Sequence, residues 1–380
     1  MTGYDAVVVG GGLVGSAAAY HLARAGEETL LVDRNDDGRA TDAGAGIVFP
    51  PTSSRTESPE WFSLALAAAD YYPELADAVG ERGGAYARTG LLSVAADPAE
   101  LPDFERERSR SRRRAEEYGR PRPDRMAEVS PDRARELYPP LGDVERALHY
   151  EDGARVDGRA FAQALREAGR EAGLTVERGD VTDVRVMRGA VRGVDTADGT
   201  SHDADAVLIA GGAWSSAVGA DLGIELPVEP QRGQILHLDV GRVPTDRPSG
   251  EWPILKAFRH QYQVPWPDGR VACGATREAG SGFDPRITLG GLREVSTEAL
   301  RIAPGLEGAR HVESRVGLRP VSSDGLPILG PVPAVEGAFV ATGHGPTGLT
   351  LGPYSGKLVA QVLRGVEPAA SLAPFGVDRF

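Results

Sequence analysis

A glycine-rich turn near the start of the chain constrains its fold more than any other feature. The apolar run 5–9 is followed by Gly10, Gly12 and Gly15 in the spacing G-x-G-x-x-G, and then by a helical pattern over 16–25. In such a turn the first glycine permits a tight bend, the second lets the backbone approach a pyrophosphate, and the third lets the helix pack on the strand. The free N–H groups at the start of the helix favour the negative phosphates. The sequence therefore predicts a parallel sheet with a dinucleotide site.

A carboxylate and a second glycine cluster indicate which dinucleotide is bound. The next apolar run, 29–33, ends in Asp33, where a carboxylate accepts hydrogen bonds from ribose hydroxyls. A second glycine-rich segment, 342–348, precedes a helical pattern over 352–363. Two distant glycine clusters suit one long ligand, with its nucleotide at the first cluster and its ring system at the second. This arrangement favours FAD over NAD.

The composition excludes several classes of partner. The net charge of −13 argues against nucleic acid or an anionic membrane surface. No apolar run approaches the roughly 20 residues that span a bilayer, and no leader precedes the first strand, so we expect a soluble cytoplasmic protein. Cys273 is the single cysteine, so no intramolecular disulfide forms and no metal site is expected. Only Lys256 and Lys357 are lysines among 42 basic residues, which together with the acidic excess fits a salt-adapted organism.

The periodicity of the remaining chain indicates a second, β-rich domain. Helical patterns cover 57–80, 103–125, 158–172 and 289–302, and strand patterns cover 89–94, 175–179, 181–194 (a hairpin), 204–210, 234–238, 262–265, 270–273 and 338–342. We expect an α/β fold in which one domain is assembled from 1–85, 150–228 and 311–380. The α+β substrate domain would then comprise 86–149 and 229–310.

Several later motifs share one family resemblance. They are Asp42 to Ile47, the 205–215 strand that ends in Gly211-Gly-Ala-Trp214, the Pro-Gln-Arg-Gly-Gln segment Pro230 to Gln234, which is expected to be a turn, Gly317 to Pro320 with Asp324 to Gly330, and Ala341 to Pro353. Over nearly the whole chain the sequence resembles the D-amino-acid oxidase and dehydrogenase superfamily, which includes glycine oxidase and sarcosine oxidase. The resemblance implies a glutathione-reductase-type FAD-binding domain into which an antiparallel β-sheet substrate domain is inserted.

The resemblance also implies a cofactor site. Some members attach FAD to a cysteine in the segment occupied here by 316–318, which has none, so we expect noncovalent FAD. Some oxygen-using members place a lysine over the flavin, and the comparable stretch 270–273 has none, which favours a dehydrogenase. The expected FAD-binding residues are Gly10, Gly12, Leu13, Val14, Gly15, Asp33, Arg34, Ala45, Gly46, Ile47, Val181, Gly211, Trp214, Arg319, Gly343, His344, Gly345, Thr347, Gly348, Leu349 and Thr350.

Oxidation of an amine by a flavin requires a group that fixes the substrate carboxylate. Arg319 is our candidate, because a guanidinium meets a carboxylate with two parallel charge-assisted hydrogen bonds. Tyr262, in a Tyr-x-Val-Pro turn, is expected to close the pocket or bond the substrate. His344 is expected to lie near the flavin pyrimidine rather than to act as a base.

Three interpretations of the function stay open. The first is oxidative deamination of a small D-amino acid, with hydride transfer from the α-carbon to flavin N5. The second is a glycine or sarcosine (N-methyl amine) oxidase. The third is a non-catalytic FAD-bearing subunit of a larger dehydrogenase complex. The sequence also leaves open whether a quinone, an electron-transfer protein or oxygen accepts the electrons, and whether the chain forms a homo-oligomer.

Overall fold

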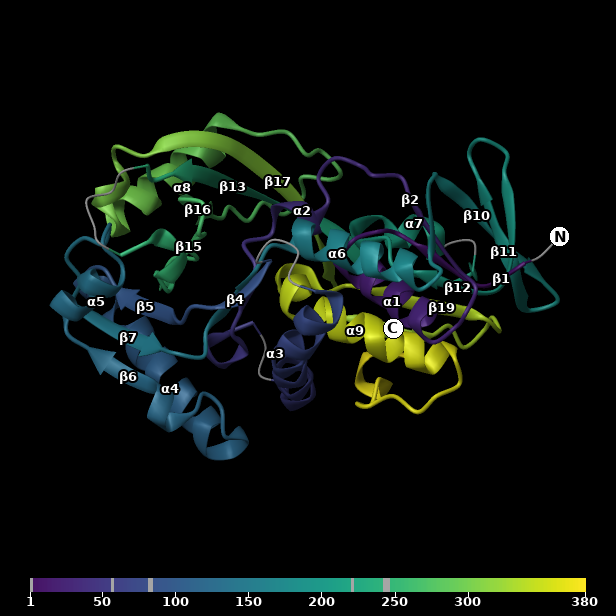
Figure 1. Ribbon diagram of the computed structural model, residues 1–380, viewed down its shortest axis with the longest axis horizontal. Helices are drawn as coiled ribbons and strands as arrows, with labels where there is room; N and C mark the ends of the chain where they lie inside the picture. Colours follow the sequence, from purple (N-terminus) through teal and green to yellow (C-terminus); the bar gives the residue numbers. More distant parts are fainter. Residues whose placement is uncertain (1–2, 56–57, 81–84, 220–221, 242–246) are drawn as a thin grey trace.

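The computed structural model describes residues 3–55, 58–80, 85–219, 222–241 and 247–380, arranged around two large sheets (Figure 1). The sheet that contains the N-terminal strand lies at one end of the molecule, and the sheet that contains β5, β6 and β7 lies at the other. Among the described helices, none is both long and apolar enough to cross a membrane.

The first sheet is parallel over most of its width. Its order is β9-β2-β1-β12-β19-β18, and the β18 strand alone in this series runs antiparallel to its neighbour. The strands are β1 (Tyr4–Val9), β2 (Thr29–Asp33), β9 (Thr175–Arg178), β12 (Ser201–Ile209), β18 (Ile328–Pro331) and β19 (Ala338–Thr342). The hairpin of β10 (Val181–Met187) and β11 (Ala190–Thr196) pairs with the first half of β12. Consecutive buried residues in β1 and β2 show that both faces of this sheet are covered.

Three helices pack together beside this sheet. They are α1 (Leu13–Arg24), α6 (Gly158–Glu171) and α9 (Gly348–Leu363), and α1 contacts both others. Close approach is possible because α1 carries alanines on its buried faces and α9 carries Gly356, at which a Cβ atom would lie 2.6 Å from the carbonyl oxygen of Val14. The result is a tightly packed layer behind the glycine-rich turn.

The second sheet has the order β17-β13-β16-β15-β14-β5-β7-β6 and is antiparallel except between β14 and β5. Its strands are β5 (Leu91–Ala95), β6 (Met126–Val129), β7 (Arg146–Tyr150), β13 (Val228–Asp239), β14 (Ile254–Ala257), β15 (Tyr262–Pro265), β16 (Arg270–Gly274) and β17 (Arg310–Ser322). Alternate residues face different cores: Leu92 and Val94 pack with α5 (Pro131–Leu137) and α8 (Leu289–Ile302), whereas Leu91 and Ala95 pack with Phe104 of α4 (Leu101–Tyr118).

A small sheet and short helices complete the described fold. The small sheet has the order β3-β8-β4 and consists of β3 (Ile47–Val48), β4 (Tyr86–Arg88) and β8 (Ala154–Val156). The remaining α-helices are α2 (Ala40–Ala43), α3 (Pro59–Val79) and α7 (Ser215–Gly219).

One segment expected to be a turn lies within a strand, and one segment with a strand pattern is a strand as predicted. Residues 230–234 lie within β13, and residues 262–265 form β15. Pro230 faces Pro320 across the β13–β17 pair. Neither proline has an N–H group to donate, so both missing donors fall at the same position of the pair, and the strands continue on either side of it. The expected Pro-Gln-Arg-Gly turn was therefore wrong.

The helix expected over 352–363 begins four residues earlier, at Gly348. Pro353 lies inside it and cannot donate to the carbonyl oxygen of Leu349. The hydroxyl of Tyr72, from α3, donates to that oxygen instead. A contact between distant segments thus satisfies the acceptor and lets the helix include the proline.

Candidate active site

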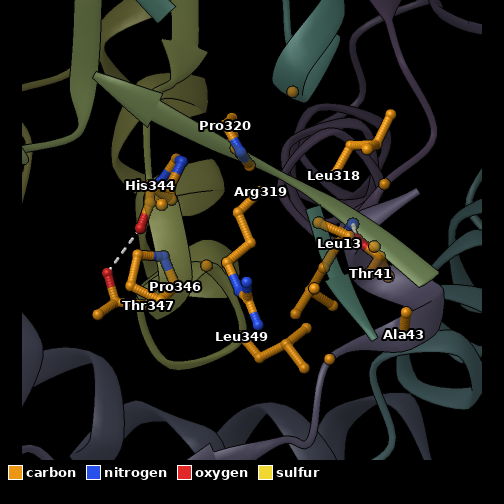
Figure 2. A pocket seen from close by; sticks show the side chains of 18 of the residues that line it. Leu13, Thr41, Ala43, Leu318, Arg319, Pro320, His344, Pro346, Thr347 and Leu349 are labelled. Atoms are coloured by element: carbon orange, nitrogen blue, oxygen red, sulfur yellow. Dashed lines mark hydrogen bonds between the residues drawn. The ribbon is translucent and has the colours of Figure 1, made fainter. Parts of the chain in front are cut away.

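A cavity of about 1140 Å³ is lined by residues from both large sheets. Its walls include the turn between β1 and α1, the end of β2, strands β14, β15 and β17, and the segment that leads into α9. Figure 2 shows Arg319 extending from its strand into the space between the His344–Thr347 turn on one side and Leu13 and Thr41 on the other. The cavity is large enough for an extended cofactor together with a small substrate.

The structure brings most of the expected cofactor residues together at this cavity. Gly15 and Gly343 do not line it. The residues that do are Gly10, Gly12, Leu13, Val14, Asp33, Arg34, Ala45, Gly46, Ile47, Val181, Gly211, Trp214, Arg319, His344, Gly345, Thr347, Gly348, Leu349 and Thr350.

The glycines of the first turn serve different purposes. Gly10 has a φ of +107°, and a Cβ atom there would lie 2.5 Å from the carbonyl oxygen of Ala210. A Cβ atom on Gly15 would lie 1.9 Å from the carbonyl oxygen of Gly10. At Gly12, by contrast, the only close neighbour of a Cβ atom is Thr41 Oγ1 at 3.2 Å, and the residue faces the cavity. Gly10 and Gly15 are therefore required by the fold, and Gly12 keeps the cavity open.

Asp33 is held beside this turn at the end of β2. Its Oδ2 accepts a hydrogen bond from the backbone N–H of Gly11, and its Oδ1 accepts from the N–H of Asn35 at 2.5 Å and from Arg39 at 3.3 Å. Arg39 also pairs with Asp42 at 2.6 Å. These contacts fix the carboxylate at the cavity wall, where it can accept hydrogen bonds from a ribose.

The segment before α9 carries a buried histidine. His344 is 3% exposed, and within the described part of the chain its Nε2 has no hydrogen-bond partner. Burial lowers the pKa of His344 to about 4, so the ring is neutral and a weak base at pH 7. Its carbonyl oxygen accepts a hydrogen bond of 2.8 Å from the Thr347 hydroxyl, drawn in Figure 2. A neutral ring in this place suits contact with a cofactor ring better than proton transfer.

Arg319 lies flat across Gly233 of the neighbouring strand. A Cβ atom on Gly233 would lie 2.4 Å from Arg319 Cζ, so only glycine leaves room for this conformation. Arg319 Nη1 donates to the carbonyl oxygen of Thr276 at 3.2 Å. Among the described residues no carboxylate pairs with its guanidinium. Arg319 can therefore bind an external anion.

Tyr262 stands close to this arginine. Burial raises the pKa of Tyr262, and the positive charges of Arg319, Arg277 and Arg55 act in the opposite direction. The hydroxyl stays protonated at neutral pH and can donate a hydrogen bond into the cavity. Tyr262 lies on strand β15, as the strand pattern over 262–265 predicts, and not in a turn.

Seven cationic residues of the cavity were not identified from the sequence: Arg39, Arg55, Arg106, Arg110, Lys256, Arg259 and Arg277. Lys256, from β14, pairs with the buried carboxylate of Glu107 and donates to the carbonyl oxygen of Thr52 at 3.2 Å. The stretch 270–273 has no lysine, as noted above, but a lysine from another strand does line the cavity. No local motif distinguishes these residues from the rest of the 42 basic side chains.

Comparison with known proteins decides the family. The family model described as "FAD dependent oxidoreductase" matches residues 5–362. The chain belongs to this family. Its cofactor is therefore FAD, as predicted, and the glycine turns, Asp33 and the long cavity fit that cofactor.

The relatives of this FAD-dependent oxidoreductase include named oxidases. Glycine oxidase of Pseudomonas putida is 33% identical over 98% of this chain and 98% of its own length. The crystal structure of iminodiacetate oxidase from Chelativorans sp. BNC1 is 37% identical with a TM-score of 0.91, covering 98% of each chain. That of glycine oxidase from Geobacillus kaustophilus is 31% identical with a TM-score of 0.88, covering 100% of each. These likenesses confirm the predicted fold, an FAD-binding domain with an antiparallel-sheet substrate domain.

Proposed function

We propose that this enzyme oxidises a glycine-type amino acid, in which a CH₂ group separates the carboxylate from a nitrogen that is free or substituted. The glycine oxidases and the iminodiacetate oxidase support this proposal, since each half of iminodiacetate is an N-substituted glycine. The reaction class, FAD-dependent oxidation of an amine or amino acid, agrees with our prediction. The relatives favour our second interpretation over the D-amino acid that we placed first.

The observation that carries the proposal is the unpaired guanidinium of Arg319 in the cavity. Its fork lies over Gly233 and has only backbone carbonyl oxygens as partners among the described residues. A substrate carboxylate would complete its hydrogen bonds and fix the distance from the anchor to the adjacent CH₂ group. The hydroxyl of Tyr262, on the neighbouring wall, would restrict the remaining rotation.

The proposed reaction removes two electrons and two protons from the C–N unit. FAD, when bound, accepts the hydride that leaves the CH₂ carbon. The nitrogen gives up its proton and forms a C=N double bond with that carbon, and water hydrolyses the imine to glyoxylate and the free amine. The task of the protein in this step is positioning, and neutral His344 is not needed as a base.

We propose oxygen as the electron acceptor, which replaces our prediction of a dehydrogenase. The named relatives are oxidases. Oxygen would take up two electrons and two protons and leave as hydrogen peroxide, so peroxide release gives a continuous assay.

Replacement of Arg319 tests the proposal. Arg319→Ala should lower kcat/KM for sarcosine. The loss should correspond to about 3–5 kcal/mol of transition-state free energy, as expected when one partner of a desolvated charge pair is removed. Arg319→Lys should recover part of the loss, because an ammonium keeps the charge but not the two-point geometry. The measurement is steady-state peroxide formation by FAD-replete protein, with dimethylamine, the decarboxylated analogue of sarcosine, as the control substrate.

The control decides how the result is interpreted. Dimethylamine should be a poor substrate for the wild type and should be affected little by either replacement. Equal losses on sarcosine and dimethylamine would show that Arg319 supports the flavin site or the fold, and the carboxylate anchor would have to lie elsewhere.

A further inference from the structure

Two arginines of the cavity, Arg55 and Arg277, have no side-chain partner in the part of the chain that the structure describes. Arg55 lies on the segment before α3, and Arg277 follows β16, so they come from different loops and not from the strand that carries Arg319. All three line the same cavity. Among the described residues, neither Arg55 nor Arg277 makes a side-chain hydrogen bond or an ion pair.

The other cationic side chains of the cavity are satisfied within the protein. Arg34, Arg39, Arg106, Lys256 and Arg259 each pair with a carboxylate, for example Arg259 with Asp97 at 2.7 Å. Arg110 donates to the carbonyl oxygen of Thr52 at 3.3 Å. Within the described residues, most of the positive charge around the cavity is therefore neutralised by carboxylates. The charges of Arg55, Arg277 and Arg319 are not.

The region around these three arginines is electrostatically unfavourable without a ligand. Arg55 and Arg277 are both exposed side chains of the cavity. Partial burial, together with the charges of Arg277 and Arg319, lowers the pKa of Arg55 to about 10. Burial and the charge of Arg319 lower the pKa of Arg277. His260, in the turn between β14 and β15, has its pKa lowered by burial and by Arg277 and Arg55, which places its ring near the same charges. The like charges of these arginines repel one another, and an anion bound between them would relieve the repulsion.

If Arg319 holds the substrate carboxylate with a two-point contact, that carboxylate is not available to Arg55 and Arg277. An N-substituted glycine carries its substituent on the nitrogen, on the opposite side of the reacting CH₂ group from the carboxylate. Resting on the proposed function, we infer that Arg55 and Arg277 form a second anion site, and that the preferred substrate is an imino-dicarboxylate, a glycine whose nitrogen bears a carboxyalkyl group. Arg319 holds the carboxylate next to the reacting carbon, and the Arg55–Arg277 pair holds the other.

The test compares two substrates that share the reacting group. Sarcosine and iminodiacetate both present a secondary amine beside CH₂–COO⁻, and they differ only in the carboxylate that iminodiacetate adds. The wild type should have a kcat/KM at least about tenfold higher for iminodiacetate. Arg277→Gln and Arg55→Gln should each lower that value by about 10- to 100-fold and should change the value for sarcosine by less than about threefold.

A matched control is available on the same surface segment. Arg286 does not line the cavity, its side chain is 73% exposed, and it pairs with Asp284 at 2.7 Å. Arg286→Gln removes the same charge a few residues beyond Arg277 and should leave both substrates unchanged. A loss on iminodiacetate in this variant would indicate a general effect of net charge and would overturn the assignment of the site.

Binding of unreactive analogues gives a readout that does not depend on turnover. Oxydiacetate and methoxyacetate replace the nitrogen of the two substrates with oxygen and cannot form an imine. Titrated into the FAD-containing enzyme and followed by the change in the flavin spectrum, oxydiacetate should bind at least about tenfold more tightly. Arg277→Gln should abolish this preference.

The outcomes separate this inference from the proposed function. Equal losses on both substrates in Arg277→Gln, or no loss on either, would overturn the second anion site even if sarcosine is oxidised. If no glycine-type amine is oxidised, the proposed function fails, and the analogue titration still decides whether the second site exists. A fall in FAD content in either variant would assign these arginines to the cofactor and would also overturn the inference.

Discussion

Gly12 is the residue at which the absence of a side chain bears most directly on the cofactor. Its φ of −65° is accessible to any residue, unlike that of Gly10, so a larger residue does not strain the backbone. A Cβ atom at Gly12 would face the cavity with Thr41 Oγ1 at 3.2 Å as its only close neighbour. A branched side chain there would therefore occupy the space of the ligand and not that of the protein.

Gly12→Val should fold but bind no FAD. The wild type should be yellow and should release its flavin to the supernatant on acid precipitation, because no cysteine is available near the 316–318 segment for a covalent bond. The measurement is flavin absorbance of supernatant and pellet, with circular dichroism to confirm folding. Gly290→Val is the matched control, since a Cβ atom at Gly290 has no neighbour within 4 Å. Wild-type flavin in the pellet, or normal flavin content in Gly12→Val, would contradict the account.

Residues of the expected nucleotide site could be selected from the sequence because their signal is local. Gly10, Gly12, Gly15 and Asp33 lie within one strand–helix–strand unit whose spacing has a physical meaning. Arg55 and Arg277 were not predictable, since only the fold brings them to one cavity and nothing in their own segments separates them from the other basic residues. Arg319 was predicted through the resemblance and not through its spacing.

At the scale of elements, the pairing of β13 with β17 positions Arg319, the proposed carboxylate anchor. Gly233 faces Gly317 in this pair, and the guanidinium of Arg319, two residues further along β17, lies over Gly233. The neighbouring strand β13 therefore has a glycine, without a side chain, at the position over which the guanidinium of Arg319 lies. The alternation of apolar residues predicted four of the eight strands of this sheet, β5, β13, β15 and β16. The segment at Pro230 was wrongly expected to be a turn, because its partner across the sheet is not visible in the sequence.

Gly233→Ala should displace Arg319 without disrupting the strand. An alanine is compatible with strand geometry, but its Cβ atom would lie 2.3–2.4 Å from three atoms of the guanidinium. We expect KM for sarcosine to rise by about tenfold, as for the loss of one charged hydrogen bond, with FAD content unchanged. Steady-state kinetics with sarcosine and dimethylamine check this result. An unchanged KM for sarcosine would show that Arg319 does not bind the carboxylate in the conformation described.

At the scale of the whole molecule, the cavity exists because segments far apart in sequence meet between two sheets. The β17 strand belongs to the second sheet. The strands that follow it, β18 and β19, belong to the first sheet, and α9 packs beside that sheet (Figure 1). One stretch of chain therefore supplies both Arg319, the proposed carboxylate anchor, and the His344 segment beside the expected flavin ring. The order of helices and strands predicted such an interleaved arrangement, whereas the shape and charge of the cavity depend on side chains from many elements.

The central claim is that this chain alone removes a hydride from a glycine-type amine. The most direct measurement is anaerobic stopped-flow reduction of the bound flavin by glycine, sarcosine, iminodiacetate, D-alanine and dimethylamine. The account predicts rapid bleaching by the glycine-type substrates, with glyoxylate as a product, and slow bleaching by D-alanine and dimethylamine. Faster flavin reduction by D-alanine than by the glycine-type substrates would support our first interpretation, an enzyme that oxidises D-amino acids. Absence of bleaching by every substrate would contradict the account and indicate a subunit that requires a partner.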